Sequence, residues 1–163
     1  MGAGSAGTFR KLIAAAIGFF FLSFAETAVA SCVADEVVFR TAAGDVAFSA
    51  EVVDTEEGRA KGLMRREEMP ASHGMLFVYP TAREVAFWMK DTPLPLDIIF
   101  LNKRGIVCSI AANTTPFSLE HIPSGCAAQT VFEVNAGQAA ATGVSIGAVA
   151  RHPAIQAPLW RCE

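Results

Sequence analysis

Hydrophobic and polar residues alternate along several short stretches of the chain, with the two-residue period typical of half-buried β-strands. The clearest case is residues 46–53, in which Val46, Phe48, Ala50 and Val52 alternate with polar or small residues. Apolar stretches predict further strands at residues 37–40, 75–79, 85–90, 96–101, 106–110, 130–134 and 144–150. The strands at 96–101 and 106–110 flank the sequence NKRG, so we expect them to form a hairpin.

Two segments have helical rather than alternating character. Asp54 followed by Glu57 fits a capping box, which predicts a helix over residues 56–64 that its two glycines keep short. Residues 138–142 predict one further helical turn that ends at a glycine. Residues 80–84 and 113–129 are expected to be loops, the second of them rich in turn residues. The pattern therefore predicts an α+β fold: a compact, β-rich single domain of seven or eight short, mainly antiparallel strands with one or two short helices.

The first thirty residues have the composition of a signal peptide. A basic start with Arg10 and Lys11 precedes an apolar run at residues 12–24, and residues 28–30 read Ala-Val-Ala, a small-x-small cleavage motif. The run is too short to span a bilayer comfortably. We therefore expect residues 1–30 to be removed and residues 31–163 to form one domain, exported to the periplasm or cell envelope without a transmembrane anchor.

Charge excludes one class of partner. The chain has 163 residues and a formal net charge of −3. Without residues 1–30 it keeps 11 basic and 15 acidic side chains, a net charge of −4. A mildly acidic domain of this size gives no reason to expect nucleic acid as a partner.

All four cysteines lie in the expected exported part, where an even number favours disulfides. Three connectivities are open, and we favour Cys32–Cys162 with Cys108–Cys126, because chain termini often lie close together. Residues 29–32, Val-Ala-Ser-Cys, also resemble a lipobox, in which Cys32 would carry a lipid anchor instead. There is no CxxC and no Cys/His spacing of a zinc site, so we expect no metal and no cofactor.

Several motifs in a fixed order resemble one protein family, DUF192, also called UPF0127. The match runs over about residues 45–150 and rests on these blocks: Gly62-Leu63-Met64-x-Arg66, Pro70, Gly74-Met75-Leu76-Phe77, Phe87-Trp88-Met89-Lys90-x-Thr92, Pro95-Leu96-Asp97, and Glu133-Val134 with Gly137, Gly143 and Gly147. Several ordered blocks are far more specific than one short motif. The resemblance implies a shared fold and, because members are often exported, agrees with the signal segment.

The resemblance does not imply an activity, since the family has no established function. Two features depart from its pattern. Asp91 stands where the family usually has asparagine, which puts any contact that depends on an amide there in doubt. Cys108 and Cys126 are not part of the pattern and resemble a local staple.

The stretch FWMKDTPLPLDIIF, residues 87–100, reads almost as core, yet it includes Lys90 and Asp97. A buried charge is usually paired or kept for a task. One interpretation is a structural salt bridge between Asp97 and either Arg59 or Lys90. The other is a site for a small polar or anionic ligand or an envelope partner, with Trp88 as a stacking platform. The candidate ligand-binding residues are Arg59, Arg66, Trp88, Lys90, Asp97 and Glu133.

We favour a non-catalytic binding domain, because no nucleophile motif or phosphate loop is visible. One alternative is a small envelope hydrolase acting on carbohydrate or peptidoglycan-like material, with Asp97 and Glu133 as a carboxylate pair. A lesser alternative is Cu(I) binding by thioethers. Its candidate ligands are Met64, Met75 and Met89. The histidines, His73, His121 and His152, lie beside turn residues and are expected to be exposed.

Overall fold

A computed structural model describes residues 31–162, together with residues 1, 2 and 4. The expected signal-peptide run and cleavage motif lie outside the described residues. Within the described part, no helix is long and apolar enough to cross a membrane.

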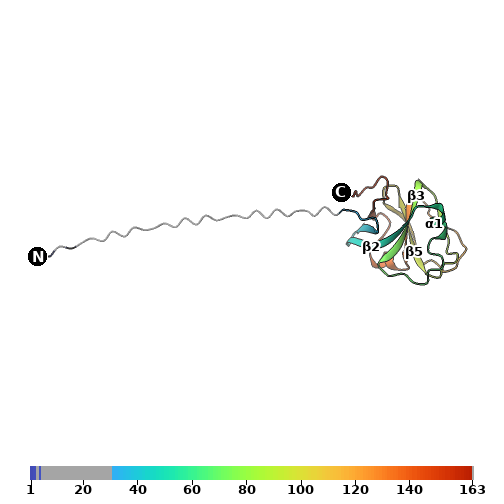
Figure 1. The fold of residues 1–163 in the computed structure, drawn as a ribbon, viewed down its shortest axis with the longest axis horizontal. Coiled ribbons are helices and arrows are strands. Elements are labelled where there is room, and N and C mark those ends of the chain that lie inside the picture. The colour runs from blue at the N-terminus through green and yellow to red at the C-terminus, as the bar shows by residue number, and fades with distance from the viewer. Residues whose placement is uncertain (3, 5–30, 163) are drawn as a thin grey trace.

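The domain consists of one large sheet, one small sheet and two short helices (Figure 1). In the large sheet the strand order is β6-β5-β8-β3-β2-β1-β9, and the small sheet pairs β4 with β7. All neighbours in the large sheet are antiparallel except β2 and β3. The elements are β1 (Glu36–Thr41), β2 (Gly44–Val53), α1 (Glu56–Lys61), β3 (His73–Arg83), β4 (Ala86–Phe87), β5 (Leu96–Asn102), β6 (Val107–Ala111), β7 (Ile122–Pro123), β8 (Ala128–Asn135), α2 (Gln138–Ala141) and β9 (Val149–Arg151). This confirms the β-rich α+β class and the hairpin formed by β5 and β6.

The large sheet curls until its two edges approach each other. Ile106, just before β6, forms an isolated antiparallel bridge with Val149 on β9. Val107 N–H also donates to the carbonyl oxygen of Ala148, at 2.9 Å. A curled sheet has an inner and an outer face, and alternation along each strand sends neighbouring side chains to opposite faces. Each face therefore needs its own apolar partners.

Two hydrophobic cores cover these two faces. The inner core includes Phe39, Phe48, Ile99, Phe132 and Val134. The outer core includes Met75, Phe77, Ile98, Phe100 and Val131. Because β3, β5 and β8 contribute to both cores, a single residue step along any of these strands moves a side chain from one core to the other.

Helix α1 begins at Glu56 as the sequence predicts, but its N-cap lies one residue after the expected Asp54. Its N-cap is Thr55, whose hydroxyl accepts a hydrogen bond from Gly58 N–H at 3.0 Å. The Asp54 prediction was therefore wrong, because Thr55 supplies the same acceptor one position closer to the helix. The helix ends at Gly62, whose φ of 47° favours a glycine, before the expected residue 64.

Other boundaries differ where loops replace regular pairing. β3 continues to Arg83 through the segment expected to be a loop, whereas only two residues of the expected strand 85–90 pair with β7. The predicted alternation in this segment is still present: Val85 and Met89 are buried, whereas Ala86, Trp88 and Lys90 are exposed. The expected strand 144–150 is regular only from Val149.

Both expected disulfides are present, Cys32–Cys162 and Cys108–Cys126. The first joins the two ends of the described domain, with a Cα–Cα distance of 5.2 Å. It uses the Cys32 sulfur, which a lipid anchor at that residue would require. The second links β6 to the loop that follows β7 and packs against the outer core.

The expectation that all three histidines are exposed holds only for His121, because His73 is half-buried beside Glu51 and His152 is buried. His152 is only 2% exposed, and its Nε2 lies 3.0 Å from the carbonyl oxygen of Ala34. Burial lowers the pKa of His152, so the neutral ring is favoured. His152 therefore fastens the segment after β9 to the start of the domain.

Candidate functional site

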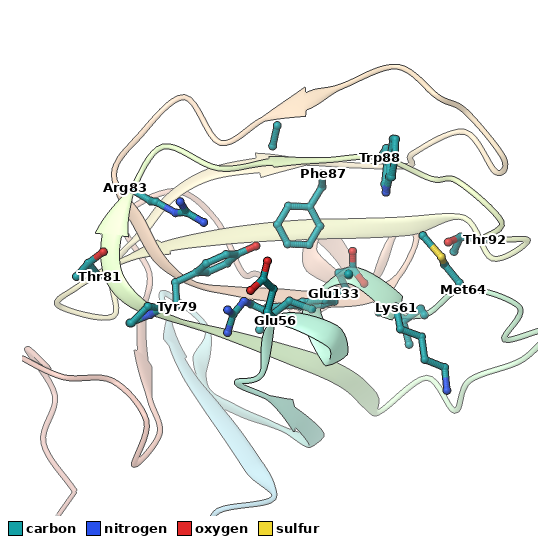
Figure 2. A pocket seen from close by; sticks show the side chains of 17 residues that line it. Glu56, Lys61, Met64, Tyr79, Thr81, Arg83, Phe87, Trp88, Thr92 and Glu133 are labelled. Carbon is teal, nitrogen blue, oxygen red and sulfur yellow. The ribbon is translucent and has the colours of Figure 1, made fainter.

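A cavity of about 600 Å³ opens between α1, the following loop, β3 and the β4 segment. Figure 2 shows Tyr79, Phe87 and Glu133 pointing toward one shared space. The lining residues are Glu56, Arg59, Ala60, Lys61, Gly62, Leu63, Met64, Phe77, Tyr79, Pro80, Thr81, Arg83, Ala86, Phe87, Trp88, Thr92 and Glu133. The chain therefore brings together three of the six predicted site residues, namely Arg59, Trp88 and Glu133.

The walls of the cavity are mainly aromatic. Phe77 and Phe87 pack edge to face, with ring centroids 5.1 Å apart. Gly62 lies against the Phe77 ring, where an added Cβ would come within 3.2 Å. A side chain at this position would push the end of α1 away from the wall, so glycine keeps the cavity in its present shape.

Basic side chains surround the mouth. Arg59 and Lys61 come from α1, and Arg83 comes from the end of β3. The Arg59 guanidinium donates to the carbonyl oxygens of Asp54 and Val78, the latter at 2.8 Å. It also lies 5.0 Å from the centroid of the Tyr79 ring, while Arg83 lies 5.5 Å from it. Arg59 is therefore held by the fold, whereas the Arg83 side chain is exposed and forms no hydrogen bond within the described chain.

Glu133 lies at the inner end of the cavity. It is 4% exposed, and its cross-strand neighbours are Met75 on β3 and Ile98 on β5. Among residues 31–162, no hydrogen bond or ion pair reaches its carboxyl group. Burial without a partner penalises the carboxylate and raises the pKa of Glu133 to about 8. At neutral pH this group is therefore mainly protonated.

The Tyr79 phenol is affected both by the basic side chains at the mouth and by Glu133 at the inner end. Burial raises the pKa of this phenol, while the positive charges of Arg59 and Arg83 act in the opposite direction. The nearby Glu133 carboxylate, when ionised, also raises the pKa of Tyr79. Tyr79 is therefore a neutral hydrogen-bonding side chain in this cavity at physiological pH.

Asp97 lies on the other face of the sheet. It pairs across β8 with Val134, whereas Ile98 pairs with Glu133, so alternation separates the two carboxylates. Asp97 is 1% exposed and accepts backbone hydrogen bonds from Asn113, at 2.8 Å, and Ala139, at 3.0 Å.

The predicted salt bridge of Asp97 with Arg59 or Lys90 is therefore wrong, because backbone amides satisfy this carboxylate. The carboxylate pair that the hydrolase alternative requires does not form either, since the sheet lies between its two members.

Of the neighbouring residues Trp88 and Lys90, only Trp88 lines the cavity. Trp88 is 42% exposed and contributes to the lining. The Lys90 ammonium lies 5.3 Å from the Trp88 ring centroid, but Lys90 is exposed and does not line the cavity. Asp91, the departure from the family pattern, has a φ of 52°, a conformation that both asparagine and aspartate tolerate.

Arg66 belongs to a separate polar network. Its guanidinium binds both carboxylate oxygens of Glu51, with one contact of 2.8 Å, and the ring of His73 lies 3.0 Å from the same carboxylate. Arg66, through its hydrogen bonds, holds the pKa of Glu51 at about 2. This network joins β2, β3 and the loop after α1, so Arg66 does not contribute to the cavity.

The three methionines proposed for copper have different environments. Met75 and Met89 are buried in the outer core, and the Met89 sulfur accepts a hydrogen bond from Thr114 at 3.2 Å. Only Met64 lines the cavity. Within the described residues, no group of three or more His, Cys, Asp or Glu side chains could hold a metal ion.

Sequence reasoning missed several cavity residues, chiefly Lys61, Phe77, Tyr79, Arg83 and Phe87. The alternation along residues 75–79 already contained a signal, because Met75, Phe77 and Tyr79 share one face of the strand. Arg83 could not be found in this way, because its segment was expected to be a loop.

These features define a small α+β domain with a curled sheet and a ligand-sized aromatic cavity. The chain belongs to the DUF192 family, described as "Uncharacterized ACR", whose family model matches residues 38–152. This match confirms the family resemblance found in the sequence.

Solved structures that are similar to the chain include the following two. One is a protein of unknown function from Novosphingobium aromaticivorans DSM 12444, with 35% identity and a TM-score of 0.69, covering 71% of this chain and 82% of that protein. The other, from Sinorhizobium meliloti 1021, is described as a proposed transcription regulator. It has 36% identity and a TM-score of 0.70, and the match covers 74% of this chain and 95% of that protein. No curated protein matches the chain significantly.

Proposed function

We propose that this protein is an exported cell-envelope domain that binds a small polar or anionic ligand in the aromatic cavity without transforming it. The observation that carries the proposal is a buried carboxyl group, Glu133, which has no protein partner and faces a cavity of about 600 Å³. Buried polar groups are normally hydrogen-bonded, so an unpartnered one at the end of a cavity suggests a ligand group there.

The size and lining of the cavity favour a small molecule. Ligand cavities commonly measure about 300–1,000 Å³ and combine apolar walls with a few polar groups. Phe77, Phe87 and Trp88 supply a surface for a ring or an apolar body. Arg83 and Lys61 at the mouth supply positive charge for an anionic group.

The same lining favours binding over catalysis. No serine, cysteine or histidine lines this cavity, and Asp97 lies beyond the sheet. A single carboxyl group can exchange a proton, but hydrolysis by a carboxylate pair requires a second acid on the same side. The two disulfides are compatible with export to an oxidising compartment.

A thermal-shift titration of protein purified after export would test this proposal. The ligands are 3-phenylpropionate, glucuronate, inorganic phosphate and glucose, because they separate negative charge from an aromatic body and from hydroxyl groups. Binding to the native state raises the unfolding temperature with ligand concentration. We expect at least one organic anion to stabilise the wild type and to lose most of this effect in Arg83→Gln and Trp88→Ala.

Arg104→Gln is the matched control, because Arg104 is an exposed arginine in the β5–β6 turn, outside the cavity. It should retain the wild-type shift. A shift that persists unchanged in both cavity variants would place the ligand elsewhere and refute the proposal.

A further inference from the structure

Basic side chains lie near the mouth of the cavity, and a carboxyl group lies at its inner end. Three basic side chains, Arg59, Lys61 and Arg83, lie with one acidic side chain, Glu56, among the lining residues near α1 and the end of β3. The inner end has one ionisable carboxyl group, Glu133. A ligand that follows this arrangement has its negative group at the mouth and its positive group inside.

No positive side chain reaches Glu133 within the part of the chain that the structure describes. The ion pairs found there are Arg40–Asp45, Arg66–Glu51 and His73–Glu51. The groups that face the cavity from the packed elements are Tyr79 and Arg83 from β3 and Glu56, Arg59 and Lys61 from α1. Arg59 is directed to backbone carbonyl oxygens instead. The missing countercharge is therefore one that a ligand could supply.

The aromatic walls favour the same kind of group. The faces of Phe, Tyr and Trp rings attract cations, and a desolvated site strengthens this attraction. Phe77, Tyr79, Phe87 and Trp88 all line the cavity that Glu133 also lines. An amine within these rings would meet favourable ring faces before it reaches the carboxylate.

We propose that the cavity is specific for small zwitterions of the amino-acid or dipeptide class, whose ammonium group pairs with Glu133 while the carboxylate lies at Arg59 and Arg83. This inference rests on the proposed function, because it assigns the ligand of the same cavity. It also makes Glu133 a selectivity residue that separates zwitterions from simple anions.

Proton balance gives this pairing a measurable signature. Free Glu133 is mainly protonated at pH 7, whereas the pair with an ammonium group requires the carboxylate. Binding therefore releases the Glu133 proton to solvent as the ammonium–carboxylate pair forms. Affinity should rise about tenfold per pH unit between pH 6 and 7, reach a maximum near pH 8 and fall at higher pH, where the ligand's own ammonium group loses its proton.

Isothermal titration calorimetry on the exported protein tests this with matched probes. The probes are phenylalanine and alanyl-phenylalanine, each beside an analogue that lacks the amine, and 2-phenylethylamine, which lacks the carboxylate. We expect at least one zwitterion to bind at least tenfold more tightly than its amine-free analogue at pH 7.5. Titrations in two buffers of different ionisation enthalpy should show release of nearly one proton at pH 7.

Glu133→Gln is the decisive variant, because it keeps the size of the side chain and removes the charge. It should reduce zwitterion binding to the level of the amine-free analogue, abolish proton release and leave 3-phenylpropionate binding within twofold of wild type. Its unfolding temperature and circular dichroism spectrum show whether the variant is folded.

The outcomes separate this inference from the proposed function. If 3-phenylpropionate binds and depends on Arg83, but neither zwitterion binds better, the zwitterion assignment is overturned while the binding function stands. Affinity that falls as pH rises toward 8 would also overturn it, because the protonated carboxyl would then be the binding form. If no probe binds at this cavity, the inference fails together with the function on which it rests.

Discussion

Asp97 and Glu133 are two buried carboxyl groups in adjacent strands, but they lie on opposite faces of the sheet and differ in their hydrogen-bond partners. On the inner face, Asp97 accepts hydrogen bonds from the backbone amides of Asn113 and Ala139. On the outer face, Glu133 faces a cavity and has no partner in the described chain. Burial alone therefore does not identify a functional acid.

The partners of each carboxyl group distinguish the two roles. Asp97 joins β5 to the segment before Thr114 and to the start of α2, so its hydrogen bonds stabilise the fold. Glu133 makes no contact of this kind, and burial destabilises its ionised form. A group that weakens the fold while facing a cavity is a strong candidate for a binding role.

Asp97→Ala should have the largest effect on stability. It removes the acceptor for two backbone N–H groups, one of them fully buried, and such loss costs roughly 3–5 kcal/mol. Urea unfolding at pH 7 would measure the change in the free energy of unfolding. If Asp97→Ala proved as stable as wild type, Asp97 would not be the structural member of the pair.

Glu133→Gln should instead increase the free energy of unfolding at alkaline pH. The pKa of Glu133 is about 8 in the folded protein and 4.5 in the unfolded reference, so the folded state holds a proton that the unfolded state has lost. This contribution is fully present below pH 4.5 and is lost as the pH rises to about 8.

The glutamine variant should therefore gain stability relative to wild type as the pH rises, by about 4 kcal/mol between pH 4.5 and 9. Denaturant titrations of both proteins across this range would measure the difference. Parallel pH profiles would show that the Glu133 carboxyl is ionised at neutral pH and hence already paired.

Arg66→Gln should have a smaller effect, which appears at acidic pH. Arg66 lowers the pKa of Glu51 to about 2, so this pair stabilises the fold above pH 4.5 and loses its effect as the pH falls toward 2. Both side chains are about a third or more exposed, so we expect about 1 kcal/mol. Thermal unfolding at pH 2.5 and 6 would show whether the two proteins converge at low pH.

Arg83→Gln should leave stability almost unchanged. The Arg83 side chain is exposed and forms no hydrogen bond within the described chain, so its loss should change the free energy of unfolding by no more than about 0.5 kcal/mol. A larger loss of unfolding free energy in urea would show that Arg83 stabilises the fold through the Tyr79 ring and is not free to bind a ligand.

Much of the fold could be predicted from local sequence signals. Alternation and short apolar stretches located the six larger strands, and the NKRG turn located the β5–β6 hairpin. The cysteine positions predicted both disulfides. The errors concern short edges, such as β4 and β9, where pairing depends on a partner strand that local periodicity does not contain.

The candidate site was harder to predict than the fold. The sequence correctly singled out Arg59, Trp88 and Glu133, because charged and aromatic residues stand out within apolar motifs. It also grouped Lys90, Asp97 and Arg66 with them, although the first is exposed, the second faces the inner core and the third binds Glu51. Proximity in the sequence does not determine which face of a sheet a residue occupies.

The sequence by itself determined which residues prefer strands, which cysteines can join and where unusual charges lie within apolar segments. Only the tertiary structure decided that Asp97 meets two backbone amides and that Glu133 faces the aromatic cavity. The physical reason is strand register: Val134 opposes Asp97 and Ile98 opposes Glu133, and this pairing follows from long-range packing of both cores.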